Sequence, residues 1–340
     1  MQTILLTGGA GYIGTVLTEE LLKKNYRVVC LDRLFFGKEK LEPFLTHPHY
    51  EVVQADVRTF DPQILAQVDV VVDLASLSND PLGELVKEKT LEINYQGRLR
   101  VNALAKQMGV KKYILASSCS IYGFNEAWCD ETSAPRPLST YAQASVRAEE
   151  CLQQATPDFC VTVLRFATVF GVSYRMRFDL AINLMTLKAF KEGAIYVLGQ
   201  GMQWRPFVHV RDVAAAILRV IEAEPAVVNR QVFNVGANQN NKKIINLAYI
   251  IREVLPFETR VNIAPDDADK RSYRVNFDKI ANVLHFTPQH SIEDGVREIY
   301  DALKQGSIWD YPDTVTVKWY KYLLEANERL KAVTINGEVI

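Results

Sequence analysis

The first fourteen residues constrain the fold of this chain more than any other stretch. An apolar run over residues 1–7 is followed at once by Gly-Gly-Ala-Gly-Tyr-Ile-Gly, and over residues 12–22 the apolar side chains recur at helical spacing. A strand, a glycine turn and a helix are therefore predicted. Such a turn directs backbone N–H groups and the positive end of a helix toward one point, where a pyrophosphate can bind. Gly8 allows the turn, Gly11 lets a phosphate approach the backbone, and Gly14 lets the helix pack closely on the strand.

An acidic residue ends the next predicted strand, over residues 27–32. Asp32 stands eighteen residues after Gly14, close to the spacing at which a carboxylate binds the ribose diol of a dinucleotide. A carboxylate repels a 2′-phosphate, so NAD is favoured over NADP, while the neighbouring Arg33 keeps NADP open as the alternative. An ordinary β-turn-α connection for the glycines and a plain strand-end role for Asp32 are the competing interpretations.

Composition narrows the class of protein. With 48% hydrophobic and 23% charged residues, the chain has the make-up of an ordinary globular protein. A net charge of −1 gives no electrostatic reason to expect nucleic acid or an acidic membrane as partner, and no apolar run is long enough to span a bilayer. The five cysteines are scattered without metal-ligand spacing, so we expect no metal site, reduced thiols and a cytoplasmic location.

Strands and helices alternate through the first half of the chain, including a long helix expected over residues 81–108. This alternation predicts an α/β fold of the Rossmann type, a doubly wound parallel sheet with helices on both faces. We expect an NAD-binding domain over residues 1–171, with later segments near 206–236 interleaved. The looser pattern beyond it predicts a smaller α/β substrate-binding lid over residues 172–305.

A helical tail is expected over residues 306–340. Its Trp319, Tyr322, Leu323 and Leu330 recur at helical spacing. We expect these side chains to pack on the body of the protein rather than to contact a ligand.

Polar and small residues follow the predicted strands, where a doubly wound sheet binds its ligand. Asp56 is placed to meet the adenine, and Ala75 and Ser76 would let a nucleotide lie against the chain. Ser118 ends another strand, and Tyr141 begins a helix. A tyrosine can remove a hydroxyl proton only when a nearby cation lowers its pKa from about 10, and a serine beside it can share the hydrogen bond of the substrate oxygen.

These segments together resemble the extended short-chain dehydrogenase/reductases and, among them, the NAD-dependent epimerase/dehydratase family acting on nucleotide sugars. The resemblance reaches about residue 305 and is carried by Thr7–Gly14, Asp73–Ser76, Ser117–Gly123, Tyr141, Leu164–Gly171 and Gln203–Asp212. It implies NAD as cofactor and a UDP-, GDP-, CDP- or dTDP-linked sugar as substrate. A homodimer is also implied, because the helices expected over residues 81–108 and 141–154 resemble the family's four-helix interface.

The resemblance also implies roles for individual residues. Ser118 matches the catalytic Ser/Thr and Tyr141 the catalytic base. The residues expected to bind NAD are Gly8, Gly11, Tyr12, Ile13, Gly14, Asp32, Asp56, Val57, Leu74, Ala75, Ser76, Asn94 and Tyr141. Those expected to bind the sugar nucleotide are Ser78, Thr168, Asn183, Leu184, Arg205, Arg271 and Arg274, since guanidinium groups suit diphosphate oxygens. An ordinary ion pair at Arg205 and a solvated face around Arg271 are the alternatives.

Two departures from the family pattern bear on the reaction. In the Tyr-x-x-x-Lys pattern the lysine binds the cofactor ribose and lowers the tyrosine pKa, but here that position holds Ser145. Arg147 lies on another face of the helix and is a poor substitute. Cys119 and Ser120 stand where sugar 4,6-dehydratases carry Asp-Glu, which disfavours 4,6-dehydration.

Two functions are therefore carried forward. The first is an NAD-dependent epimerase or dehydrogenase acting on a ring hydroxyl, at C4, of a nucleotide sugar, with turnover impaired at Ser145. The second is a non-catalytic NAD-binding protein with a regulatory or interaction role on the same fold. A natural enzyme with altered chemistry, a deliberately disabled variant and a protein without turnover all fit Ser145.

Overall fold

A seven-stranded parallel sheet forms the centre of the computed structural model, which describes residues 1–265, 269, 271–335 and 338. The strand order is β11-β7-β5-β4-β1-β2-β3. Because the sheet is covered on both faces, its strands are nearly continuous apolar runs. The strands are β1 Thr3–Thr7, β2 Arg27–Asp32, β3 Tyr50–Gln54, β4 Val70–Asp73, β5 Lys112–Ser118, β7 Cys160–Phe166 and β11 Gln231–Val235.

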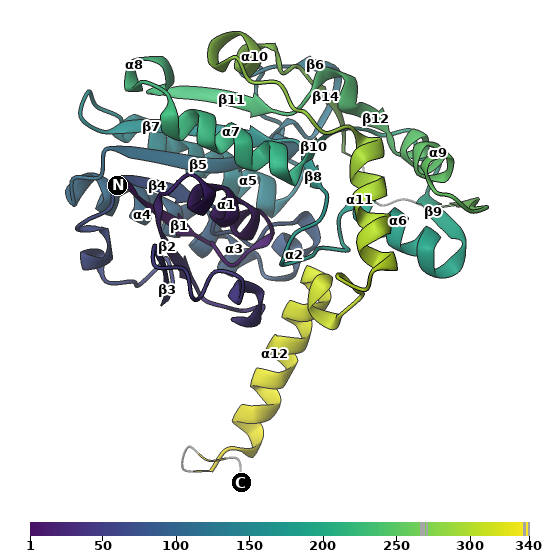
Figure 1. The fold of residues 1–340 in the computed structure, drawn as a ribbon, viewed down its shortest axis with the longest axis horizontal. Coiled ribbons are helices and arrows are strands. Elements are labelled where there is room, and N and C mark those ends of the chain that lie inside the picture. The colour runs from purple at the N-terminus through teal and green to yellow at the C-terminus, as the bar shows by residue number, and fades with distance from the viewer. Residues whose placement is uncertain (266–268, 270, 336–337, 339–340) are drawn as a thin grey trace.

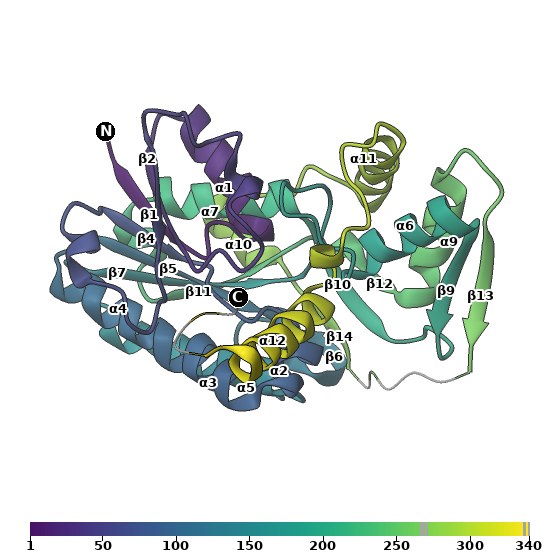
Figure 2. The same ribbon diagram turned by 90° about the horizontal axis from the view of Figure 1, so that it is seen from below.

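Helices cover both faces of this sheet. On one face lie α1 (Tyr12–Lys23) and α7 (Val210–Glu222), and on the other α4 (Arg98–Gln107) and α5 (Thr140–Ala148) (Figure 2). The predicted α/β fold with a doubly wound parallel sheet is confirmed. All strands run in the same direction, so their carboxyl ends meet at one edge, and that edge carries the site.

The prediction of a single long helix over residues 81–108 is wrong. The chain forms α2 (Asp80–Leu85), α3 (Lys87–Leu91), a π-helical segment (Glu92–Gly97) and then α4. Val86 interrupts the helix with φ −136° and ψ 62°. A π-helical segment occurs mostly as a single turn at a functional site, and this one ends immediately before Arg98.

A second lobe lies beside the carboxyl edge of the sheet (Figure 2). Two short sheets border the edge: β8, β10 and β12 form one, and β6 and β14 the other. Farther out, β9 pairs with β13, and α6 and α9 pack beside this pair (Figure 2). The elements of this lobe are β6 Phe124–Cys129, β8 Thr168–Phe170, α6 Ala181–Glu192, β9 Ala194–Leu198, β10 Trp204–His209, β12 Asn241–Lys243, α9 Ile244–Val254, β13 Arg260–Ala264, β14 Ser272–Val275 and α11 Ile292–Lys304. Between β14 and α11, α10 (Asp278–Leu284) returns to the large sheet and packs against β11.

The last helix, α12 (Thr316–Val333), projects from the rest of the chain (Figure 1). At its beginning, the indole Nε1 of Trp319 donates to the carbonyl oxygen of Phe35 at 2.6 Å. Farther along, Tyr322 is 58% and Leu330 51% exposed, so the prediction that these two side chains pack on the body of the protein is wrong. Neither α12 nor any other helix within the described residues is long and apolar enough to cross a membrane.

Candidate active site

The glycine turn between β1 and α1 has the geometry that the sequence predicts. Gly8 adopts φ +69°, and a Cβ there would lie 2.8 Å from the backbone of Ala75. A Cβ on Gly14 would lie 2.6 Å from the carbonyl oxygen of Gly9. Larger residues are therefore excluded at both positions, because Gly8 lies against the backbone that follows β4 and Gly14 lies against the turn itself.

A cavity of about 760 Å³ begins at this turn and extends along the carboxyl edge of the sheet into the second lobe. Its volume lies within the range of cofactor and ligand sites. Most of the residues predicted for the site line this cavity: Gly8, Gly11, Tyr12, Ile13, Gly14, Asp32, Asp56, Val57, Leu74, Ala75, Ser76, Ser78, Ser118, Tyr141, Thr168, Leu184, Arg205 and Arg271.

Four predicted residues are not among the described residues that line the cavity: Asn94, Ser145, Asn183 and Arg274. The amide of Asn94 hydrogen-bonds both the N–H and the carbonyl of Leu77, and the amide of Asn183 holds Gly171 and the hydroxyl of Tyr12. These two asparagines therefore hold Leu77 and Tyr12, which line the cavity, without lining it themselves. Arg274 donates to the carbonyl of Glu126 on the outer surface.

Asp32 lies at the end of β2 with its carboxylate on the cavity wall. It accepts hydrogen bonds from the backbone N–H of Ala10 at 3.1 Å and of Leu34 at 2.8 Å, while burial raises its pKa. The neighbouring Arg33 pairs with Asp56 at 2.8 Å. Although burial alone would raise it, hydrogen bonds from Arg58 and Arg33 lower the pKa of Asp56 to about 2.

The cofactor end of the cavity fits a dinucleotide. The Oγ atom of Ser76 is buried without a hydrogen-bond partner among the described residues, so a polar ligand atom would satisfy it. Arg175 is buried on the same wall, with its guanidinium 3.6 Å from the ring centroid of Phe36 and Nη2 bonded to Thr316. Tyr320 of α12 closes this end and packs edge-on against Phe36.

Ser118 and Tyr141 meet at the middle of the cavity. Ser118 ends β5, and its Oγ lies 2.7 Å from that of Ser120. Tyr141 is in the first turn of α5, whose N-cap is the side chain of Ser139. Burial of the phenol raises the pKa of Tyr141, against the opposing effect of a hydrogen bond with Ser118.

Position 145 offers no charge to Tyr141. Ser145 is 2% exposed, and its hydroxyl donates to the carbonyl oxygen of Tyr141 at 3.0 Å. Arg147 is exposed, with its guanidinium 5.6 Å from the ring centroid of Tyr95. Three charged side chains from other elements act on the phenol: Asp80 raises the pKa of Tyr141, whereas Arg98 and Arg177 lower it.

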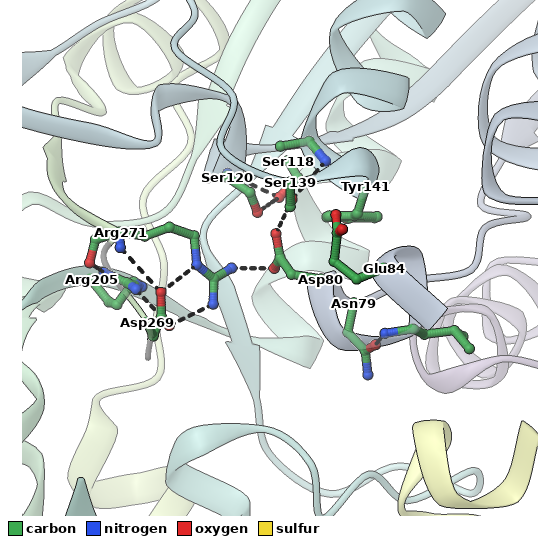
Figure 3. A network of polar contacts seen from close by, with 12 residues as sticks. Asn79, Asp80, Glu84, Ser118, Ser120, Ser139, Tyr141, Arg205, Asp269 and Arg271 are labelled. Carbon is green, nitrogen blue, oxygen red and sulfur yellow. Dashed lines mark hydrogen bonds and ion pairs between the residues drawn. The ribbon is translucent and has the colours of Figure 1, made fainter. Parts of the chain in front are cut away.

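A chain of ion pairs crosses from α2 to the second lobe (Figure 3). Asp80 accepts from Ser139 and pairs with Arg271. The guanidinium of Arg271 also binds both carboxylate oxygens of Asp269, at 2.7 and 2.6 Å. Arg205 pairs with the same carboxylate at 2.9 Å. Of the three arginines predicted to bind the diphosphate, Arg205 and Arg271 line the cavity, and each is held by a carboxylate.

Several residues that line the cavity were not predicted from the sequence. The arginines and the acid of Arg175-Met-Arg177-Phe-Asp179 line the cavity, and the alternation of charged and apolar residues there was an available signal. Asp80 is the N1 residue of a helix, where an acid is ordinarily explained by the helix dipole. Nothing in the sequence pattern distinguishes Arg98 from a surface residue of an amphipathic helix.

Together, the glycine turn, the acid that ends β2 and the Ser118–Tyr141 pair around one cavity define an enzyme of the short-chain dehydrogenase/reductase type. The chain belongs to the NAD dependent epimerase/dehydratase family, whose sequence profile matches residues 4–236. The predicted family, the enzyme class and NAD as cofactor are thereby confirmed.

Known proteins of this kind match most of the chain. UDP-glucuronic acid decarboxylase 1 of Danio rerio is 27% identical, over 87% of this chain and 71% of its own length. A putative UDP-glucose 4-epimerase of Methanocaldococcus jannaschii is 27% identical, over 89% of this chain and 99% of its own. Among solved structures, MoeE5 in complex with UDP-glucose and NAD is 25% identical, with a TM-score of 0.79 over 90% of this chain and 100% of its own.

The UDP-glucuronic acid 4-epimerase of Bacillus cereus, at 22% identity, has a TM-score of 0.81 over 89% of this chain and 99% of its own. This similarity bears on the fold alone.

Proposed function

We propose that this chain is an NAD-dependent enzyme that oxidises the C4 hydroxyl of a nucleotide-diphosphate sugar, as an epimerase or as a dehydrogenase. The observation that carries the proposal is the order of groups along one cavity. The glycine turn follows β1 and Asp32 ends the neighbouring β2, Ser118 ends β5 two strands away from β1 with Tyr141 beside it, and Arg205 of β10 and Arg271 directly before β14 come from the second lobe. A dinucleotide, a reacting sugar ring and a diphosphate require that order. Relatives named for acting on UDP-glucuronic acid and UDP-glucose support the substrate class.

Each residue has a definite chemical task in this proposal. Tyr141, as phenolate, accepts the proton of the sugar hydroxyl, and the hydroxyl of Ser118 orients the same oxygen. Bound NAD supplies the nicotinamide ring that accepts the hydride. Arg205 and Arg271 exchange the carboxylate of Asp269 for diphosphate oxygens, to which planar guanidinium groups bind bidentately.

The surroundings of Ser118 argue against 4,6-dehydration. Cys119 is 1% exposed, and its thiol donates to the carbonyl oxygen of Arg165. Burial raises the pKa of the Cys119 thiol, and Cys119 is not among the described residues that line the cavity, so the thiol is poorly suited to act as an acid at C5 or C6. In an epimerase the keto sugar is reduced on its other face, and in a dehydrogenase it is released.

A protein that binds NAD without turnover is the second candidate. It is favoured by one observation: the Tyr141 pKa is raised by burial, while position 145 carries a serine without charge. Under this alternative the cavity holds the cofactor permanently and Tyr141 remains protonated.

One experiment distinguishes the two candidates. The purified chain is denatured to release its bound nucleotides for identification by mass spectrometry, and it is then assayed with NAD on UDP-, GDP-, CDP- and dTDP-sugars. Turnover of at least one sugar is expected, and it should be lost in S118A and Y141F while NAD still binds. Bound NAD without turnover of any sugar would establish the second candidate instead.

We also propose a homodimer formed through α5 and the helical segments over residues 81–108, with the enzyme in the cytoplasm. Light scattering coupled to size-exclusion chromatography tests the dimer. A charge substitution on the exposed face of α5, such as Q143E, should shift the mass toward that of a monomer. A wild-type mass of one chain would refute the proposal.

A further inference from the structure

Arg98 is the first residue of α4, immediately after the π-helical segment Glu92–Gly97. Its side chain is directed inward: the residue is 2% exposed and lies on the cavity wall. The π-helical segment packs against α5, the helix that carries Tyr141 and Ser145. A permanently charged side chain therefore enters the site from α4, directly after the segment that packs against α5.

The hydrogen bonds of this guanidinium are incomplete. Nη2 donates to the carbonyl oxygen of Asp73 at 3.0 Å, and Nε forms a buried ion pair with Asp73 Oδ1 at 3.6 Å, a separation too long for a hydrogen bond. Nε is buried without a hydrogen-bond partner in the described part of the chain, and Nη1 donates no hydrogen bond there either. The Asp73 carboxylate already accepts from Thr7 at 2.6 Å and from Tyr113 at 2.5 Å. A buried guanidinium with unused donors on a cavity wall has hydrogen bonds to offer to a ligand.

The other cations near Tyr141 are committed elsewhere. Arg177 donates to both oxygens of Asp179, at 3.0 and 2.9 Å, and also to Ser78. Its positive charge is therefore balanced by a carboxylate in good geometry. Arg147 points outward over Tyr95. Of the two arginines that lower the pKa of Tyr141, Arg98 is the one with unused donors.

We propose that Arg98 supplies the positive charge that position 145 lacks, stabilising the Tyr141 phenolate and donating hydrogen bonds to an oxygen of the bound cofactor. Two roles are thereby moved from a side chain on α5 to one on α4. The inference rests on the proposed function for its catalytic part. Its cofactor-binding part can be measured whether or not the chain turns over a sugar.

The test compares Arg98→Met, Arg98→Lys, Ser145→Lys and the double variant R98M/S145K, with Arg147→Met as the matched loss of an arginine outside the cavity. NAD affinity is measured by calorimetry. The titration of Tyr141 is followed by the ultraviolet absorbance of tyrosinate, with Y141F subtracted, and the pH dependence of kcat is measured on any sugar that is turned over.

For R98M we expect NAD affinity to fall about ten-fold or more. The titration of Tyr141 and the acid limb of kcat should move upward by roughly one pH unit or more. S145K should restore both properties in the R98M background, yet raise kcat of the wild type by less than about ten-fold, because the charge is already present. R147M should match the wild type.

Three results would overturn the proposal. The first is a folded R98M with unchanged NAD affinity and Tyr141 titration, which would make Arg98 only an anchor for Asp73. The second is a gain of orders of magnitude from S145K in the wild type. The third result applies if R98M does not fold, in which case R98K replaces it. R98K keeps the charge but loses the planar fork, so it should keep the Tyr141 titration while weakening NAD binding. An unchanged NAD affinity of R98K would refute the cofactor-binding role of Arg98.

Failure of the proposed function looks different. In that case no variant turns over any sugar, while NAD affinity and the Tyr141 titration still respond to Arg98.

Discussion

Glu149 neutralises Arg165, a buried arginine on β7, the strand that pairs with the Ser118-bearing strand β5. Its carboxylate accepts from Arg165 Nε at 3.0 Å and Nη2 at 2.7 Å, and from the hydroxyl of Ser117 at 2.6 Å. The side chains of Arg165 and Glu149 are only 7% and 10% exposed, so solvent screens this ion pair little. Replacing Glu149 with Gln keeps the shape but leaves the guanidinium buried without a counter-charge.

The expected cost can be worked out from this geometry. Removing one member of a buried ion pair costs about 3–5 kcal/mol. With an unfolding entropy of about 2.1 cal/mol/K per residue, the entropy for this chain is roughly 0.7 kcal/mol/K, so Tm should fall by about 4–7 °C. Ser117 loses its charged acceptor, and because it lines the cavity beside Ser118, kcat should fall as well.

Differential scanning calorimetry measures this change against a matched control. Glu150 is exposed, its nearest polar contact being the Tyr95 hydroxyl at 3.4 Å, so E150Q should change Tm by less than about 1 °C. An E149Q protein with the same Tm as the wild type would refute the reasoning, because it would show that burial of Arg165 does not require the Glu149 charge.

Three further outcomes are expected. Asp32→Ala should weaken NAD about ten-fold or more, as measured by calorimetric titration, because charged hydrogen-bond acceptors are lost. Asp80→Asn should move the acid limb of the pH–rate profile to lower pH: the Asp80 charge raises the pKa of Tyr141, so its removal favours the phenolate at lower pH. Gly8→Ala should lower the free energy of unfolding, measured in urea, by more than about 1–2 kcal/mol, which is the cost of a side chain at a positive φ alone. Gly109→Ala, at φ +81° with open space around it, should cost only that amount.

The parts of the site that the sequence predicted share one physical property. Gly8, Asp32, Asp56 and Ser118 each follow or end a strand of a parallel sheet, and the carboxyl ends of such strands meet at one edge. Locating the strands along the chain was therefore enough to bring these residues together. Tyr141 was predictable for a similar reason, because a helix N-terminus facing that edge begins beside it.

Arg98 illustrates what the sequence pattern does not contain. An uninterrupted helix over residues 81–108 would fix its direction from the earlier residues at 100° per residue. The break at Val86 and the π-helical segment instead change the angular position of every later side chain. Which face of α4 meets the cavity therefore depends on packing between elements. The same holds for Tyr320, whose helix reaches the cofactor end of the cavity from the far end of the chain.

The serine at position 145 consequently has a different meaning in three dimensions. A motif assigns the charge of a site to one position of one helix, but a charge acts on Tyr141 through space, from whichever element brings it close. Here two arginines oppose Asp80 and the effect of burial on the phenol. Loss of a cation from α5 therefore need not leave Tyr141 without one, and inactivity does not follow from Ser145 alone. The magnitude of the response to R98M and S145K, measured in both backgrounds, shows which helix carries the charge.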